Sequence, residues 1–186
     1  MIIVLIVLGL LILFGIFTYN RLVTLRLAWT RASADIDVQL KQRHDLVPNL
    51  VETVKGYAAH ESGVFTQVAA ARSAAMQANT VAEKSAAETA LTGALGSLFA
   101  VAEAYPQLRA SENFQGLQAE LTDLENKIAS ARRFMNNAAA EYNSAIQQFP
   151  AVLVAGPLGF HAMPMFELDA TERGETRNAP KVSFSA

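Results

Sequence analysis

Residues 111–150 read SENFQGLQAELTDLENKIASARRFMNNAAAEYNSAIQQFP and carry the most regular hydrophobic pattern in the chain. Apolar side chains recur there in steps of three and four for about five heptads, the spacing of one face of a long helix packed against others. Pro150 cannot continue a helix, and Ser111 is a suitable N-cap. The apolar positions are Phe114, Leu117, Leu121, Leu124, Ile128, Ala131, Met135, Ala138, Tyr142, Ala145 and Phe149.

A second long helix is predicted upstream, over residues 18–59, where no glycine precedes Gly56 and apolar residues again follow helical spacing. Pro48 interrupts it, because proline lacks a backbone donor and crowds the carbonyl of His44. We expect a structural break at Asp45 and Pro48. The preferred form is a kink or short break within one rod, and the alternative is a new helix capped by Asp45.

Two shorter helices are expected between the long ones. The first covers about residues 64–78 and the second begins near Val81, because Thr80 and Glu83 have the spacing of a capping box. Pro106 ends the second. These patterns predict an all-α protein, an antiparallel four-helix bundle with two long and two shorter helices over residues 21–150.

Residues 1–17 read MIIVLIVLGLLILFGIF, without one polar side chain, which is long enough to cross the hydrocarbon core of a bilayer. No small-residue cleavage site follows, so we expect an uncleaved transmembrane anchor over residues 1–20 rather than a signal peptide. The side chains expected to contact lipid or its interface are Ile2, Leu5, Leu8, Leu11, Phe14, Phe17 and Tyr19.

Three arginines, Arg21, Arg26 and Arg31, follow the apolar run. Basic residues beside a span favour the cytoplasmic side. We therefore expect a single-pass protein of the cell (inner) membrane with its N-terminus outside and its bundle in the cytoplasm. Residues 151–186 are predicted to be an apolar and then disordered tail.

Composition argues against several functions. A formal charge of −2 gives no basic surface for nucleic acid, and the absence of cysteine excludes thiolate metal ligands. The remaining metal-ligand types, at His44, Glu52, His60 and Glu61, lack a paired-ligand spacing and are interpreted as solvated side chains. No nucleotide-binding or nucleophile motif occurs, so no catalytic, cofactor or metal residue is predicted.

Charged and amide side chains beside the apolar stripes are interpreted mainly as devices that fix helix register. The alternative is a charged groove for a ligand. These residues are Arg72, Glu103, Glu125, Arg132, Arg133, Asn126 and Asn143.

Three segments resemble the bacterial LemA family: KQRHDLVPNLVETVKGYAAHE at residues 41–61, AVAEAYPQLRASENFQGLQAEL at 100–121, and ENKIASARRFMNNAAAEYNSAIQQFP at 125–150. The resemblance extends from residue 1 to about residue 166. It implies an anchored four-helix bundle without an established enzymatic activity, and it supplies no catalytic residue.

Unequal helix lengths predict self-association. The shorter helices can cover only the outer half of the long pair, which leaves apolar side chains exposed near the bilayer. We expect a homo-oligomer there, with residues 151–160 covering the seam or resting in the lipid interface. The alternative is that the tail folds back and completes a monomer. The expected interface residues are Leu22, Leu25, Trp29, Tyr142, Ile146 and Phe149.

Two functions remain open. The preferred one is a non-enzymatic scaffold or adaptor that contacts the lipid bilayer and acts by self-assembly or by docking a partner membrane protein. The alternative is a ligand-binding sensor coupled to the membrane through the first helix. Buried polar space between helices favours the sensor, and long exposed apolar seams favour the scaffold.

The orientation is testable by proteolysis. Protease added outside intact cells should leave the bundle uncut, because the three arginines after the span retain it in the cytoplasm. Immunoblotting of the protected fragment measures this. Cleavage within residues 21–150 would refute the assignment.

Overall fold

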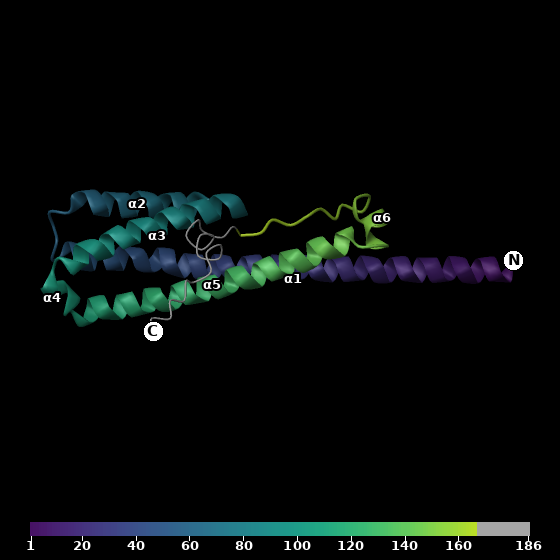
Figure 1. Ribbon diagram of the computed structural model, residues 1–186, viewed down its shortest axis with the longest axis horizontal. Coiled ribbons are helices and arrows are strands. Elements are labelled where there is room, and N and C mark those ends of the chain that lie inside the picture. Colours follow the sequence, from purple (N-terminus) through teal and green to yellow (C-terminus); the bar gives the residue numbers. More distant parts are fainter. Residues whose placement is uncertain (167–186) are drawn as a thin grey trace, which may run out of the picture.

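The computed structural model describes residues 1–166 and is entirely helical over that range apart from turns and one extended segment (Figure 1). The all-α prediction is confirmed, including two long helices and two shorter ones. Two further helices, α4 and α6, are single turns that the sequence pattern did not predict. The elements are α1 (Ile2–Lys55), α2 (Ser62–Gln77), α3 (Val81–Glu103), α4 (Pro106–Arg109), α5 (Glu112–Gln147) and α6 (Ala151–Ala155).

Helix α1 continues through Pro48 without interruption. Neither the expected short break at Asp45 and Pro48 nor the alternative of a new helix capped by Asp45 is present. The Asp45 carboxylate instead pairs with Lys41. Pro48 has no N–H to donate to the carbonyl of His44. That carbonyl accepts a hydrogen bond of 2.6 Å from Nε of Arg72 on α2. The missing donor therefore frees an acceptor that joins α1 to α2.

The ends of the shorter helices follow local sequence signals. The capping box at α3 is present, with Thr80 accepting from the amide of Glu83 and the Glu83 carboxylate accepting from the amide of Thr80. The two backbone amides that bond the Glu83 carboxylate, those of Thr80 and Asn79, hold the pKa of that group below its ordinary value. Ser111 is the N-cap of α5, but its side chain forms no capping hydrogen bond.

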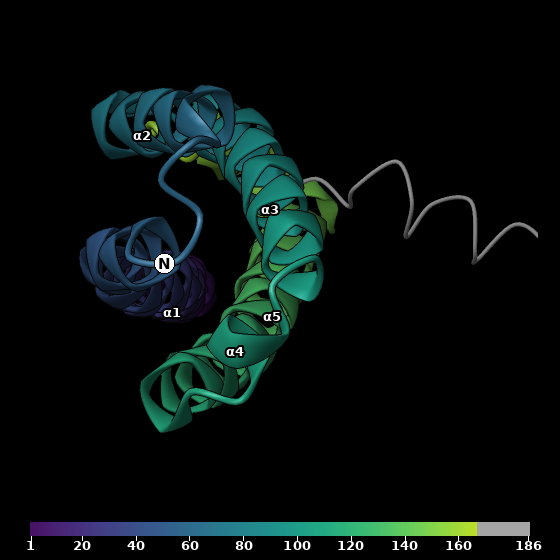
Figure 2. The same cartoon turned by 90° about the vertical axis from the view of Figure 1, so that its left-hand side faces the viewer.

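The helices form two main pairs, α1 with α5 and α2 with α3. Viewed along the long axis, α2, α3 and α5 lie in an arc around α1 (Figure 2). The shorter pair covers only the outer half of the longer one, as predicted from their lengths (Figure 1). We call residues 40–124 the head. Leucines of α1, α3 and α5, among them Leu50, Leu98 and Leu121, share its hydrophobic core.

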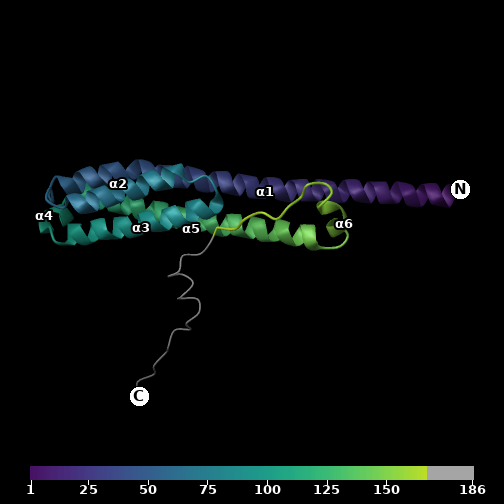
Figure 3. The same cartoon turned by 90° about the horizontal axis from the view of Figure 1, so that it is seen from above.

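The inner half of the α1–α5 pair is covered by the end of the described chain. Helix α6 turns back at the inner end of α5, and residues 156–166 then run toward the head (Figure 3). Ala151, Ala155 and Phe160 pack with Leu22 and Tyr142 in a second cluster. Phe166 packs farther along, in a third cluster of α1 and α5 residues.

This arrangement buries several residues of the predicted oligomer interface within one chain, and self-association itself stays a prediction. Leu22, Tyr142 and Ile146 are buried within one chain, Leu25 is partly buried, and Trp29 donates from Nε1 to the Pro164 carbonyl at 3.1 Å. Phe149 alone among the predicted interface residues is strongly exposed, at 81%. The alternative, in which the tail folds back onto its own protomer, describes this structure. The predicted disorder concerns residues beyond Phe166, which lie outside the described part.

Two asparagines of α5 hold the extended segment at residues 160–166, which we call the strap. Asn143 donates to the carbonyl of Met163 at 2.9 Å and accepts from its amide at 2.8 Å. Asn136 forms the same pair of bonds with Phe166, at 2.9 and 2.7 Å. Asn136 and Asn143 lie two helical turns apart, a rise of about 10.5 Å, and the three extended residues from Met163 to Phe166 span about 10 Å. The spacing of the asparagines therefore matches that of the backbone groups they bond.

The first turns of α1 stand clear of the other helices, and their apolar side chains are exposed. Among residues 1–166, two helices are long and apolar enough to cross a membrane, α1 and α3. The apolar window of α1 is unburied, whereas α3 contributes Leu91, Leu95 and Leu98 to the head core. The predicted anchor residues therefore form the candidate membrane span.

The freed carbonyl of His44 predicts coupling between Pro48 and Arg72. Pro48→Ala should stabilise the protein by restoring an intrahelical bond and improving helix propensity. Arg72→Met should lower the free energy of unfolding by about 1–2 kcal/mol in the wild type and by clearly less beside Pro48→Ala. Denaturant titration of the four proteins measures the coupling. Arg133→Met, on the exposed face of α5, is the control and should show equal effects in both backgrounds.

Candidate functional site

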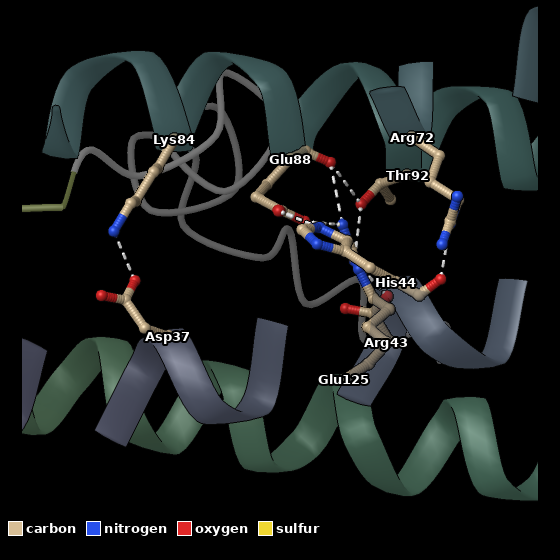
Figure 4. Close-up of polar contacts among 8 residues, drawn as sticks. All are labelled: Asp37, Arg43, His44, Arg72, Lys84, Glu88, Thr92 and Glu125. Carbon is tan, nitrogen blue, oxygen red and sulfur yellow. Dashed lines mark hydrogen bonds and ion pairs between the residues drawn. The ribbon is translucent and has the colours of Figure 1, made fainter. Parts of the chain in front are cut away.

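The most unusual feature of the head is an arginine in its core. Arg43 lies on the same face of α1 as Leu40, Val47 and Leu50, and its side chain is fully buried. Because a guanidinium cannot lose its charge in a protein, it needs anionic partners there. It pairs with Glu88 of α3 and with Glu125 of α5 (Figure 4). One side chain thus joins three helices.

Hydrogen bonds from His44, Arg43 and Thr92 converge on Glu88 and its neighbour Thr92. The imidazole Nε2 of His44 lies 2.6 Å from Oε1 of Glu88, and because a carboxylate only accepts, the ring donates this bond. Arg43 also donates to the Glu88 carbonyl at 3.1 Å and to the Thr92 hydroxyl at 3.2 Å. The Thr92 hydroxyl in turn donates to the Glu88 carbonyl at 3.0 Å.

The network sets the ionisation of Glu88. Burial by itself would raise the pKa of this carboxyl, but the hydrogen bond from His44 and the charge of Arg43 outweigh it, so the pKa lies below the ordinary value of 4.5. Glu88 is therefore an anion at neutral pH. The buried guanidinium of Arg43 and the buried carboxylate of Glu88 pair with each other, which is the arrangement expected of a structural lock rather than of a poised acid or base.

An open groove of about 330 Å³ lies over this network, between α1, α2 and α3. His44 and Glu88 form part of its wall. Ion pairs border it: Lys84 of α3 bonds Asp37 of α1 across the groove, and Lys41 pairs with Asp45 along α1 (Figure 4 shows the first). The groove is lined by Asp37, Leu40, Lys41, His44, Asp45, Ala75, Met76, Ala78, Lys84 and Glu88.

Several predicted register residues do join elements, in ways that the sequence did not specify. Glu125 pairs with Arg43, Arg72 bonds the His44 carbonyl, and the guanidinium carbon of Arg132 lies 4.8 Å from the ring centre of Phe166. Asn143 holds the strap rather than another helix. Glu103, Asn126 and Arg133 are exposed.

The described residues do not bring the candidate metal ligands together. Among residues 1–166 no group of three or more candidate ligands lies together. Glu52 and His60 are exposed as predicted, but the interpretation of His44 as solvated is wrong, since it is buried against Glu88. The reason is that position 44 flanks the apolar face of α1, where α3 covers it.

Arg43 and Glu88 were missed as site residues, although the sequence contained a signal for each. Arg43 falls between Leu40 and Val47 at the spacing of the buried stripe, and Glu88 occupies the position one turn before Leu91. A charged residue of each sign at the core positions of two helices indicates a buried pair. Because Arg43 and Glu88 are far apart in the sequence, their pairing could not be predicted from local spacing.

Replacing Glu88 tests the network. Glu88→Gln should lower the free energy of unfolding at pH 7 by about 3 kcal/mol, because it leaves the buried Arg43 with a weaker set of acceptors. A carboxyl whose pKa is depressed by folding contributes stability above its unfolded pKa, and that contribution is lost as pH falls through the folded pKa. The difference between wild type and variant should therefore be full above about pH 5 and shrink in acid below 4.5.

Denaturant titration at several pH values measures this difference. Glu120→Gln, an exposed carboxylate on α5, is the matched control and should change stability by less than about 0.5 kcal/mol at any pH. A pH-independent loss in Glu88→Gln would contradict the assigned role of the ionised carboxylate.

Comparison with known proteins places this architecture in a family. The chain is 27% identical to magnetosome protein MamQ of Magnetospirillum gryphiswaldense, over 80% of its own length and 64% of that relative. It is 26% identical, with the same coverage, to magnetosome proteins MamQ 1 and MamQ 2 of Paramagnetospirillum magneticum. The chain thus spans less than two thirds of these relatives. The LemA family profile matches residues 32–184, so this chain, with its exposed apolar helix and charge-locked helical head, belongs to the LemA family.

Proposed function

We propose that this protein is a non-enzymatic, membrane-anchored scaffold or adaptor whose head docks a partner membrane protein. The observation that carries the proposal is the continuity of α1, which is one helix from the exposed apolar turns at Ile2 to the head core at Val54. From Tyr19 to Lys55 such a helix extends about 55 Å. A partner bound at the outer end would be held at that distance from the bilayer.

The buried charges support a rigid head. Arg43 bonds α3 and α5, and Arg72 bonds α1. The two asparagines of α5 fasten the strap along the stem, the name we give to residues 22–39 of α1 together with residues 125–147 of α5. Because each contact has a defined direction, the helices cannot slide past one another without leaving a buried charge unpaired. The magnetosome relatives support a location at a membrane.

Site-specific photocrosslinking in intact membranes tests the adaptor role. A photoreactive residue at Tyr57, exposed on the turn after α1, should give a discrete adduct with another membrane protein. The same probe at Leu27, exposed on the stem, is the control and should not. Mass spectrometry identifies the adduct. Absence of any protein adduct at Tyr57, or identical adducts at both positions, would contradict the proposal.

A second candidate function, a ligand sensor, is favoured by the groove over His44 and Glu88. Its bordering ion pairs and the apolar side chains of Leu40 and Met76 suit a small polar ligand with one apolar part. In that case a library of small polar compounds would contain one that raises the melting temperature of the detergent-solubilised protein. Lys84→Met should abolish the rise, because it removes one charge from the wall, and Lys127→Met on α5 should not.

A further inference from the structure

We propose that residues 149–158, which we call the foot, form a second membrane contact that inserts its outer face into the leaflet beside α1. The inference goes beyond the adaptor role and rests only on the membrane association of α1. It concerns the region where α5 ends and α6 begins, which lies toward the N-terminal end of α1, beside Phe14 to Leu22 (Figure 1).

The foot has two faces of different character. Its inner face is buried, because Ala151 and Ala155 pack in the same cluster as Leu22 and Tyr142. Its outer face is apolar, and no other part of the described residues covers it. The exposed side chains are Phe149 at 81%, Val152, Leu153 at 67%, Val154 and Leu158. These exposed apolar side chains lie close together in one short segment, and such a patch usually marks an interaction site.

The position of the foot along α1 identifies what covers it. A hollow of about 150 Å³ is lined jointly by Phe14 and Phe17 of α1 and by Phe149, Pro150 and Ala151. The foot therefore lies at the same level as the last side chains of the candidate span. Phe17 is itself 69% exposed. A bilayer that surrounds Phe14 and Phe17 reaches the outer face of the foot.

Charge supports the same occupant. From residue 142 to residue 166 the sequence has no aspartate, glutamate, lysine or arginine. Arg21, which lines the hollow beside Gln148 and Phe149, supplies a cation at the upper edge of the apolar zone. Segments that lie in the membrane interface have this distribution of side chains, with apolar groups at the boundary of the acyl chains and a cation at the level of the lipid phosphates.

A ring contact at the first residue of the strap, two residues after the foot, holds this region against the anchor. The rings of Tyr19 and Phe160 meet edge to face with centroids 5.5 Å apart. Tyr19 directly follows the apolar run, where an amphipathic ring suits the membrane interface. The foot is thus packed against α1 on one side, and its other side is free to meet lipid.

Spin labels measure the depth of the foot directly, because the chain has no native cysteine to remove. The full chain is reconstituted in phospholipid vesicles with a single label at Leu153→Cys. Phe134→Cys, at 59% exposure on the stem part of α5, is the matched control, and Leu13→Cys in the span is the reference for lipid. Collision rates are measured with oxygen, which concentrates in lipid, and with a water-soluble nickel chelate.

The label at residue 153 should collide more often with oxygen than with nickel, as at residue 13, and the label at residue 134 should show the reverse. Leu158→Cys repeats the measurement at a second outer position, so that a local disturbance at one position does not decide it. Nickel accessibility at 153 and 158 equal to that at 134 would overturn the proposal. Protection of both positions from both reagents would also overturn it, since a second protein copy rather than lipid would then cover the foot.

Discussion

The buried guanidinium of Arg43 is the constraint on which the rest of the head depends. A permanent charge in a helical core requires carboxylates, and these come from α3 and α5, so three helices have only one register in which the charge is neutralised. Apolar contacts between alanine-rich helices specify position poorly, because small side chains leave few ridges and grooves. The charge network adds the directional contacts that the alanines of α2 and α3 do not provide. It also accounts for the burial of His44, which completes the coordination of Glu88.

Backbone groups without a partner in a regular helix connect separate segments of the protein. Proline in a helix interior normally counts as a defect, yet at Pro48 the unsatisfied carbonyl faces α2 and receives Arg72. The strap is similar in that side chains bond its backbone. It is an extended segment without a strand partner, and its hydrogen bonds come from asparagine side chains. Both devices satisfy buried or half-buried main-chain groups that the regular helix pattern leaves open.

Periodicity and capping signals predicted the helices because they are local. The heptad spacing up to Pro150, the capping box at Thr80 and the apolar first turns of α1 each involve residues within a few positions of one another. The pairing of Arg43 with Glu88 was not predictable in that way, since it joins residues on separate helices and depends on their relative rotation. The packing of the C-terminal segment over the inner half of the long helices was not predictable for a related reason. The shorter helices were expected from their lengths to leave this half uncovered, but hydrophobicity alone does not say whether a neighbour or residues 151–166 cover it.

The strap illustrates how hydrogen bonds to the backbone add to side-chain packing in holding a segment. Asn143 and Asn136 bond the amides and carbonyls of Met163 and Phe166, and Trp29 donates to the carbonyl of Pro164, while the rings of Phe160 and Phe166 are buried. Backbone chemistry therefore limits substitution at these positions, in addition to the packing of the buried Phe166 ring. Proline is acceptable at 164, where only an acceptor is needed, and would be excluded at 163 and 166, where an N–H must be donated. The path of this segment along the stem is thus specified twice, by the two asparagines that bond its backbone and by the two phenylalanine rings that pack near its ends.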